Sequence, residues 1–398
     1  LACWPVGVER GWMTREEARD ITLTTIRFFH DAPQGPEATG VTGYKGFFYH
    51  FLDMDTGHRF GTTELSTVDT ALLLGGMLFA ARYFDGDDAG ETEIREKAQA
   101  IYDRVEWDWA VARPNLISMG WHPETGHIPY DWHVYNEGMI VLLMAMGSET
   151  HPVSPDVWTE WCSAYGDSWT DAYGSPHLHF APMFGHQYSH MFIDFRGIRD
   201  AWMREKSAEI GDFDYFENSV RAAEAQQFYA RTNPMGWVGY DDDVWGLTAC
   251  DGPGDFIQTI DGREREFFSY SARGPGERDD GTIAPTAAMA SMPFAPDAVT
   301  TCLKAMRARY GEALYTQWGF LDSFNPTLKE RDGPLRHGQI VPDIGWVNGD
   351  YLGIDQGPIV VMIENHRTNL VWNHMHGEPN LIRGLQRAGF EGGWLDRA

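Results

Sequence analysis

The sequence predicts an all-α protein in which paired helices form a single ring, an α/α toroid or barrel. Three observations predict this fold. About eleven segments of the chain have helical hydrophobic periodicity, strand signals are few, and the βαβ alternation of doubly wound sheets and TIM barrels is absent. Long loops rich in Gly, Pro, Trp and Asp separate the helical segments. These loops are expected to build a site at one end of the ring.

The helical segments can be followed in order along the chain. Thr14 is a favourable N-cap, and the helix after it runs to about residue 30 with Glu16 and Glu17 in its first turn, where they complement the helix dipole. Segment 66–84 is mostly apolar and predicts a buried helix, whereas 92–107 is amphipathic. Further helices are expected at 134–146, 155–165, 188–204, 215–232, 284–292, 296–310, 357–372 and 380–388.

No feature divides the chain into two domains. A Pro/Ser linker, a charge run and an internal repeat are all absent, so we expect a single domain over residues 1–398 with a short extension at about 1–12. Strand signals are confined to 44–51 and short pieces near Trp237. Segment 251–281 has little periodicity, and a loop of that length inside a compact domain is typically functional. It is expected to fold over a cleft, or alternatively to be a solvated excursion far from the site.

The composition limits the ligand. The 398 residues include 31 Lys and Arg against 58 Asp and Glu, a net charge of −27. Such a chain lacks the positive footprint for nucleic acid or an anionic membrane surface, which indicates a neutral ligand. The 16 Trp and 16 Tyr exceed the usual needs of a core, and amphipathic rings suit the apolar CH faces of sugars. No apolar run is long enough to predict a membrane-spanning helix.

The cysteines and the N-terminus leave the compartment open. The four cysteines are Cys3, Cys162, Cys250 and Cys302. They lie far apart and lack the spacing of a zinc site, so the sequence is compatible with one or two disulfides and also with buried free thiols. The chain begins with Leu1 rather than Met. This start is compatible with a trimmed chain, a mature secreted form or the remnant of a lipoprotein cleavage site.

The candidate chemistry is carried by carboxylates. The sequence has no P-loop, GxGxxG, HExxH or GxSxG motif. His186 and His190 are four residues apart but have no evident carboxylate partner, so no metal site is expected. Acidic residues lie in loops rich in Gly, Trp and Asn: Glu64, Asp69, Glu137, Asp194, Asp251, Asp279, Asp280, Asp322 and Asp355. Each alone could be a turn former or an ion-pair partner. At least two are expected to form the acid and base pair that glycoside hydrolysis needs.

Long motifs in a fixed order point to one family. They are GYKGFFYHFLDMDTGHRF, TELSTVDTALLLGGMLFAARYF, YNEGMIVLLMAMGS, HQYSHMFIDFRGIRD, GYDDDVWGLTACDGP, DDGTIAPTAAMASMPFAP, WGFLDSFN and IDQGPIVVMIENHRTNLVW. In these motifs the chain resembles glycoside hydrolase family 144, also called glucoamylase-like, over roughly residues 12–390. The resemblance implies an (α/α)6 barrel, an inverting mechanism without an obligatory cofactor, and hydrolysis of β-1,2-linked glucan internally or by release of sophorose. Cys250 stands where the family pattern leads us to expect Ser.

Roles for individual residues complete the prediction. Glu137 is expected to be the general acid, because the apolar helix behind it and Trp132 and Tyr135 before it should raise its pKa. Asp322 and Asp69 are candidates for the base side. Sugar hydroxyls are expected to meet Glu64, Asp251, Asp279, Asp280, Asp355, Gln356, His186, Gln187, Arg196 and Arg273. The expected aromatic walls of the subsites are Trp121, Trp132, Tyr135, Trp245, Trp318 and Trp346.

Several alternatives stay open at this point. An open cleft would cleave internally, and a blocked one would release short products from an end. A binding protein without catalytic carboxylates could use the same aromatic residues, and a uronate lyase would need a Tyr or His base beside an Arg or a metal. We expect an exported, monomeric protein that binds a neutral, gluco-configured oligo- or polysaccharide, does not span a membrane and does not bind nucleic acid.

Overall fold

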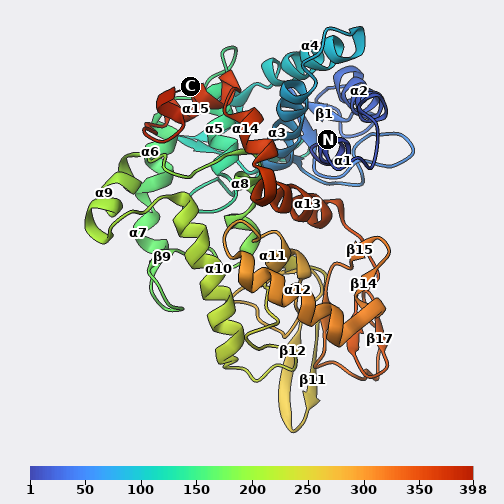
Figure 1. Cartoon of the computed structure of the whole chain (residues 1–398). Helices are drawn as coiled ribbons and strands as arrows, with labels where there is room; N and C mark the ends of the chain where they lie inside the picture. Colours follow the sequence, from blue (N-terminus) through green and yellow to red (C-terminus); the bar gives the residue numbers. More distant parts are fainter. Residues whose placement is uncertain (398) are drawn as a thin grey trace. The chain divides into compact units, whose positions relative to one another are not determined.

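The structure, a computed structural model, describes residues 1–397, which group into two compact units (Figure 1). Unit 1 comprises Leu1–Asp167, Tyr188–Tyr215 and Asn369–Ala398, and unit 2 comprises Ser168–Gln187 and Phe216–Thr368. Helices carry most of the regular structure, which confirms the predicted helical character. No helix among the described residues is long and apolar enough to cross a membrane. The single barrel over residues 1–398 stays a prediction.

The helices of unit 1 follow the hydrophobic pattern. Thr14 caps α2 as expected, accepting from the Glu17 amide while the Glu17 carboxylate accepts from the Thr14 amide. The helices are α1 (Cys3–Glu9), α2 (Arg15–Asp31), α3 (Thr67–Tyr83), α4 (Ala89–Asp103), α5 (Met139–Gly147), α6 (Asp156–Ser163), α7 (Tyr165–Ser168), α8 (Tyr188–Phe192), α9 (Ala201–Ile210), α14 (Leu370–Met375) and α15 (Pro379–Arg387), with short 3-10 helices η1 (Trp107–Ala110) and η4 (Leu395–Arg397). The segment expected as an extension at 1–12 instead forms α1, which packs against α2.

Three predicted helices are interrupted, each for a local reason. Val134 has a positive φ of 64°, so α5 begins only at Met139. The segment after α8 is irregular until Asp200, whose side chain accepts from the Met203 amide and starts α9. Asn369 adopts the left-handed conformation and separates α13 from α14.

A small antiparallel sheet lies in unit 1. Its strand order is β1 (Gly43–Tyr44), β2 (Phe47–Tyr49), β3 (Leu65–Ser66), β6 (Gly120–His122) and β7 (Gly126–His127), while β4 (Val111–Arg113) pairs with β5 (Leu116–Ile117). The hairpin predicted within 44–51 is therefore confirmed. Strand β3 leads directly into α3, with Ser66 as the N-cap that accepts from the Asp69 amide. Sheet and helix meet at this point, which places the candidate site described below.

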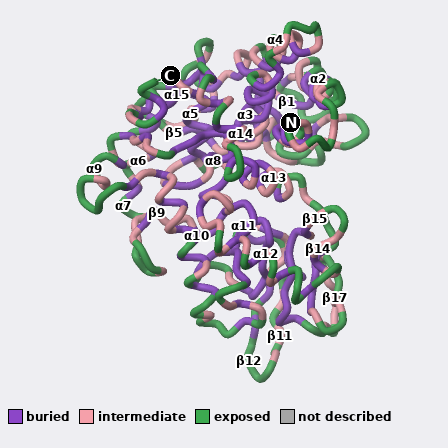
Figure 2. Tube along the Cα trace, viewed as in Figure 1, coloured by how far each residue is buried: buried purple, intermediate pink, exposed green. Residues whose placement is uncertain are grey.

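Helix α5 is buried along its whole length, and α15 packs closely against it (Figure 2). Glycines make the approach possible. A Cβ added at Gly147 would lie 2.2 Å from the Asn380 carbonyl oxygen, and one at Gly384 would lie 2.1 Å from the Leu143 carbonyl oxygen. The two backbones are thus in contact, and larger residues at either glycine would separate the helices.

Unit 2 combines four helices with short strands. The helices are α10 (Tyr215–Thr232), α11 (Pro285–Met289), α12 (Pro296–Tyr310) and α13 (Gly353–Thr368), with η2 (Met183–His186) and η3 (Gly311–Ala313). The strands are β8 (Trp169–Thr170), β9 (His177–Leu178), β10 (Ala249–Cys250), β11 (Phe256–Ile260), β12 (Arg263–Phe267), β13 (Ser271–Ala272), β14 (Tyr315–Thr316), β15 (Gly319–Phe320), β16 (Phe324–Asn325), β17 (Gln339–Val341) and β18 (Gly345–Val347). The pairs are β8–β9, β10–β13, β11–β12 and β14–β15, and β16-β18-β17 form a three-stranded sheet.

Segment 251–281 is therefore not the irregular loop that the sequence predicts. It contains the β11–β12 hairpin, in which Phe256 pairs with Phe267 and Ile260 with Arg263. Phe267 is fully buried with Leu328 and Trp346, and Phe256 and Ile260 pack against them. The hairpin is thus anchored by its own small hydrophobic core.

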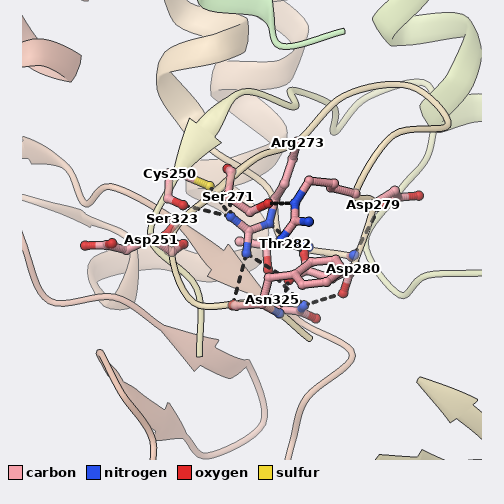
Figure 3. A network of polar contacts seen from close by, with 12 residues as sticks. Cys250, Asp251, Ser271, Arg273, Asp279, Asp280, Thr282, Ser323 and Asn325 are labelled. Carbon is pink, nitrogen blue, oxygen red and sulfur yellow. Dashed lines mark hydrogen bonds and ion pairs between the residues drawn. The ribbon is translucent and has the colours of Figure 1, made fainter. Parts of the chain in front are cut away.

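A fully buried ion pair also holds this region together (Figure 3). Arg273 donates to both carboxylate oxygens of Asp280 at 2.8 Å, and neither side chain is exposed. Arg273 also donates to the carbonyl oxygens of Cys250, Ser271 and Ser269. The pair therefore ties β10, β13 and the segment after the hairpin to one another.

We expect Asp280→Asn to lower the free energy of unfolding by about 3 kcal/mol, because it leaves the Arg273 charge buried without its counter-ion. Urea denaturation of the variant measures this loss, and Asp332→Asn, at an exposed position of the same unit, is the control. The double variant Arg273→Met/Asp280→Leu should recover part of the stability, since neither charge is then buried. A wild-type unfolding midpoint for Asp280→Asn would contradict the role of the pair.

Candidate active site

The register of the unit 1 sheet brings His50 and Glu64 together. Phe48 pairs with Ser66 and Tyr49 with Leu65, so His50, just after β2, comes opposite Glu64, just before β3. The His50 amide donates to the Glu64 carbonyl oxygen, and the His50 Nδ1 lies 2.7 Å from Glu64 Oε1. The ion pair lowers the pKa of Glu64 and raises that of His50.

Asp69 completes a chain of charges through His50. Its carboxylate lies in the first turn of α3, where Ser66 Oγ donates to Oδ2 at 2.5 Å. The His50 Nε2 lies 3.7 Å from the same oxygen. The imidazole therefore stands between Glu64 and Asp69, and its ring stacks on Phe51 with centroids 4.4 Å apart.

Glu137 lies in the turn that precedes α5. Its Oε2 is fully covered and has no hydrogen-bond partner among residues 1–397. Burial is the main reason that its pKa rises to about 7, and the negative charge of Asp69 adds to the rise. Glu137 is therefore a carboxyl that can hold a proton near neutral pH, as the sequence predicts for the general acid.

Trp132 connects the turn of Glu137 to the start of α3. Its indole nitrogen donates to Thr67 Oγ1 at 2.8 Å, and a Cβ added at Gly138 would lie 2.4 Å from its ring. Because Trp132 and Tyr135 are buried, they form the apolar surroundings of the turn and do not offer an exposed face to a sugar. Their predicted role as subsite walls is wrong. The pKa of Glu137 is raised by burial, which is the predicted direction.

His50 should make the stability of the fold depend on pH. Its pKa is raised in the folded protein, so the stabilisation is fully present below the unfolded value of about 6.5 and is lost as pH rises through the folded value. At acidic pH, we expect the free energy of unfolding of wild type to exceed that of His50→Gln by less than about 1 kcal/mol. The difference is small because the His50–Glu64 pair is partly exposed. Denaturation at about pH 5.5 and about pH 9 measures this difference. His366→Gln, on the surface of α13, is the control, and a difference that does not change with pH would contradict the prediction.

A second group of carboxylates lies in unit 2 around Asp322. The Oδ2 of Asp322 accepts hydrogen bonds from the Asp251 amide, Ser323 Oγ and Asn348 Nδ2 at 3.1, 2.9 and 2.8 Å. Its Oδ1 is covered, and a hydrogen bond joins its carboxyl to that of Asp355. Asp322 is 2% exposed, and burial raises its pKa.

Asp355, at the start of α13, belongs to the same group. Burial and the charge of Asp322 raise its pKa to about 8, and Asp251 contributes to the rise. Two buried carboxyls that interact this strongly hold one proton between them at neutral pH. We place this proton on Asp355, because the three donors around Oδ2 stabilise the ionised form of Asp322.

Asp251 also belongs to the residues that could hold a metal ion. The ligand atoms of Asp251, His337 and Asp350 all lie within 4.8 Å of one another. Two carboxylates and one imidazole are a donor set for a divalent cation, but Asp350 is exposed, and exposed acidic groups are common without an ion. The geometry is therefore compatible with a cation without requiring one.

Several residues expected to bind sugar are instead buried in the protein. Arg273 and Asp280 have no exposed surface, which excludes direct contact with a ligand. Trp245 and Trp346 are also buried, so their predicted role as subsite walls is wrong. Gln187 is 1% exposed and donates to the Ala287 carbonyl oxygen and Ser291 Oγ.

Other predicted ligands are held by neighbouring groups. The His186 ring is buried, with Nε2 lying 3.1 Å from the Phe180 carbonyl oxygen. Gln356 donates to the Phe320 carbonyl oxygen. Arg196 forms a two-point ion pair with Asp194 and lies over the Trp372 ring. These contacts position the side chains without need of a ligand.

Two of the predicted aromatic walls remain available. Trp318 is 71% exposed, and Trp121 is half-buried in the unit 1 sheet, where it packs on Tyr44 and Trp109. Trp121 pairs with Leu65 in the register, the residue that follows Glu64. Trp121 therefore lies one strand away from the His50–Glu64 pair.

The prediction missed His50 and Asn348. His50 lies within the motif GYKGFFYHFLDMDTGHRF but is given no role there, and Asn348 lies outside the quoted motifs. Each is also distant in sequence from the carboxylate that it contacts. The hairpin signal at 44–51 would have placed His50 at the end of a strand, but its partner follows only from the strand register. Asn348 reaches Asp322 because β16 and β18 pair.

Comparison with known proteins relates these sites to a family. The model of the Glycoamylase family, described as "Putative glucoamylase", matches residues 129–379, more than half of the chain. The chain belongs to the glycoamylase family. The match includes Glu137, Asp251, Asp322 and Asp355, and it extends over parts of both units.

Several proteins that are similar to this chain have named activities. The exo β-1,2-glucooligosaccharide sophorohydrolase (non-reducing end) of Parabacteroides distasonis is 29% identical over 96% of this glycoamylase-family chain, and the chain spans half the length of that curated relative. An endo-β-1,2-glucanase from Chitinophaga pinensis, solved with sophorotriose and glucose, is 25% identical with a TM-score of 0.80 and covers 99% of this chain and 86% of its own. A β-1,2-glucanase from Parabacteroides distasonis is 28% identical with a TM-score of 0.78, covering 97% of this chain and 53% of its own.

Proposed function

We propose that this chain is a glycoside hydrolase that cleaves β-1,2-linked glucan. The observation that carries the proposal is Glu137, a carboxyl whose pKa is raised to about 7 and whose Oε2 has no hydrogen-bond partner among the described residues. A carboxyl that is protonated near neutral pH can protonate the oxygen of a glycosidic bond as that bond breaks. Relatives named as β-1,2-glucanases and as a β-1,2-glucooligosaccharide sophorohydrolase support the choice of substrate.

The proposed reaction is a single displacement with inversion. Glu137 gives its proton to the leaving oxygen while a water molecule attacks the anomeric carbon from the opposite face, and a carboxylate takes a proton from that water. The products are a free hydroxyl on one sugar and a new reducing end on the other. Exchange with solvent then returns the proton to Glu137 and removes the one from the base.

Asp322 is our first candidate for the base. Three donors fix its Oδ2 and favour the ionised carboxylate, which is the form that can take a proton from water. The raised pKa of Asp322 makes its carboxylate a better proton acceptor. Asp69 is the second candidate, although its Oδ2 already accepts from Ser66.

We further propose three finer features of the protein. These are an (α/α)6 barrel, action as a monomer and a periplasmic or secreted location. The helical character of the chain and its similarity to solved β-1,2-glucanases support the barrel. The location follows from the substrate, because glucans of this linkage are made and met outside the cytoplasm.

Early products from a long β-1,2-glucan test the activity. The products are separated by thin-layer chromatography. A ladder of product sizes would show endo action, and a lone disaccharide or glucose would show exo action. Proton NMR of the first product should show the α-anomer, since inversion at a β-linkage gives that configuration. Binding of the glucan without any new reducing end would overturn the proposal and indicate a binding protein instead.

A further inference from the structure

A cavity of about 470 Å³ lies in unit 2 beside the β11–β12 hairpin. Strand β12 and the segment around Arg278 line it together with the end of α10 and the residues that follow that helix. Its volume falls in the range of small-molecule sites. None of the catalytic candidates Glu137, Asp69 and Asp322 lines it.

Two arginines in the lining lie against aromatic rings. The guanidinium of Arg265 lies 4.1 Å from the Trp237 ring centroid, and that of Arg278 lies 4.2 Å from the Phe268 ring centroid. Arg265 is 7% exposed and is fixed by hydrogen bonds to the carbonyl oxygens of Met235 and Gly236. Its Nε is covered and has no partner, and neither arginine forms an ion pair with a described residue.

The carboxylates in the lining complement these donors. The side chains of Glu264 and Glu266 are exposed and form no hydrogen bond or ion pair with the part of the chain that the structure describes. Asp279, in contrast, accepts from Tyr229, Trp237 and Tyr240 at 2.8, 2.9 and 2.7 Å. Asp279 thus organises the cavity wall, while Glu264 and Glu266 keep free acceptors.

This combination of groups selects the chemistry of a ligand. An anion would meet two guanidinium groups but also three carboxylates, so its net attraction is small. An apolar ligand would cover the charged Arg278 guanidinium and the carboxylates of Glu264 and Glu266 without offering them hydrogen bonds. A sugar has hydroxyls that accept from arginine and donate to glutamate, and CH faces that pack on aromatic rings such as Phe268.

We propose that this cavity is a second saccharide-binding site, which holds a glucosyl segment of the glucan outside the catalytic centre. The choice of a β-1,2-linked sugar rests on the proposed function, whereas the class of neutral sugar rests on the lining. Figure 3 shows Asp279, in the cavity wall, and Asp251, in the acidic group, on opposite sides of the Arg273–Asp280 pair. The two sites are thus separated within unit 2 by that buried pair.

Hydrogen–deuterium exchange with sophorose as the probe tests the proposal, because it reports binding at the hairpin whether or not a glucan is cleaved. At a sophorose concentration ten times the dissociation constant, exchange in peptides over 256–267 should slow about tenfold. The variant Phe268→Ala/Arg278→Ala should lose this protection. Phe228→Ala/Arg231→Ala is the matched control, since Arg231 lies over the Phe228 ring outside the cavity.

Each outcome decides the proposal. Protection of 256–267 in wild type and the control, but not in the cavity variant, would support it. Equal protection in all three proteins, or none in any, would overturn it. Protection by inorganic phosphate but not by sophorose would show that the cavity binds an anion and not a neutral sugar, which would also overturn the proposal. The products from β-1,2-glucan, measured separately, show whether the catalytic function itself fails.

Discussion

Replacing Glu137 by glutamine is expected to slow the hydrolysis of β-1,2-glucan about 10³- to 10⁴-fold. Glutamine keeps the shape of the side chain but has no acidic proton for the leaving oxygen. The loss corresponds to about 4–5.5 kcal/mol of transition-state stabilisation. The rate of wild type should also fall as pH rises through about 7, because Glu137 then loses the proton that it must donate. Initial rates of reducing-end formation across pH measure both effects.

A control at the other end of the same helix separates chemistry from folding. Glu149 follows α5 and is exposed, so Glu149→Gln should retain wild-type activity and the wild-type pH profile. Near-native turnover by Glu137→Gln would show that another group is the general acid. If the rate of Glu137→Gln still fell with rising pH as the wild-type rate does, a group other than Glu137 would cause that fall.

Asparagine at position 322 is expected to lower turnover about 10³-fold while the protein still binds the glucan. The amide cannot take a proton from the attacking water, although it can keep hydrogen bonds with Ser323 and Asn348. Single-turnover rates and binding of the glucan, measured on the same variant, distinguish lost chemistry from lost affinity.

The neighbouring carboxylates provide the comparison. Asp332 is exposed in the same unit, so Asp332→Asn should behave as wild type. If Asp322→Asn kept its rate while Asp69→Asn lost it, the base would be Asp69. Asp355→Asn should mimic the protonated carboxyl that we place at this position, and we therefore expect a smaller loss than from Asp322→Asn.

The sequence was sufficient for much of the secondary structure because hydrophobic spacing reports helices locally. Helices α10 and α12 have the predicted bounds, and α2 begins after the predicted cap. The spacing could not show that Val134 has a positive φ, which delays α5 and leaves Glu137 in a turn. The strands around Asp251 were missed because two-residue ladders have too few positions to show an alternation of polar and apolar residues.

The sequence identified candidate site residues by their type, but it did not show which residues contact one another. The pKa of Glu137 is raised in the expected direction, because its burial can be inferred from apolar neighbours along the chain. No direction could be predicted for Asp322 and Asp355, whose pKa values are raised by burial among groups distant in sequence. The exposure of a tryptophan cannot be inferred in that way: Trp346 is buried beneath the hairpin, whereas Trp318 faces solvent. The partners of Arg273 and His50 depend on tertiary pairing, which spacing does not encode.

The close contact between α5 and α15 has a consequence for the order of synthesis. Residues near position 380 cover the face of α5 that contacts Gly384, whereas α5 itself ends at Gly147. A ribosome therefore makes more than 200 further residues, including all of unit 2, before α15 can cover this helix. During that interval a fully apolar helix needs another partner, so the nascent chain carries a binding surface for chaperones that the finished protein does not expose.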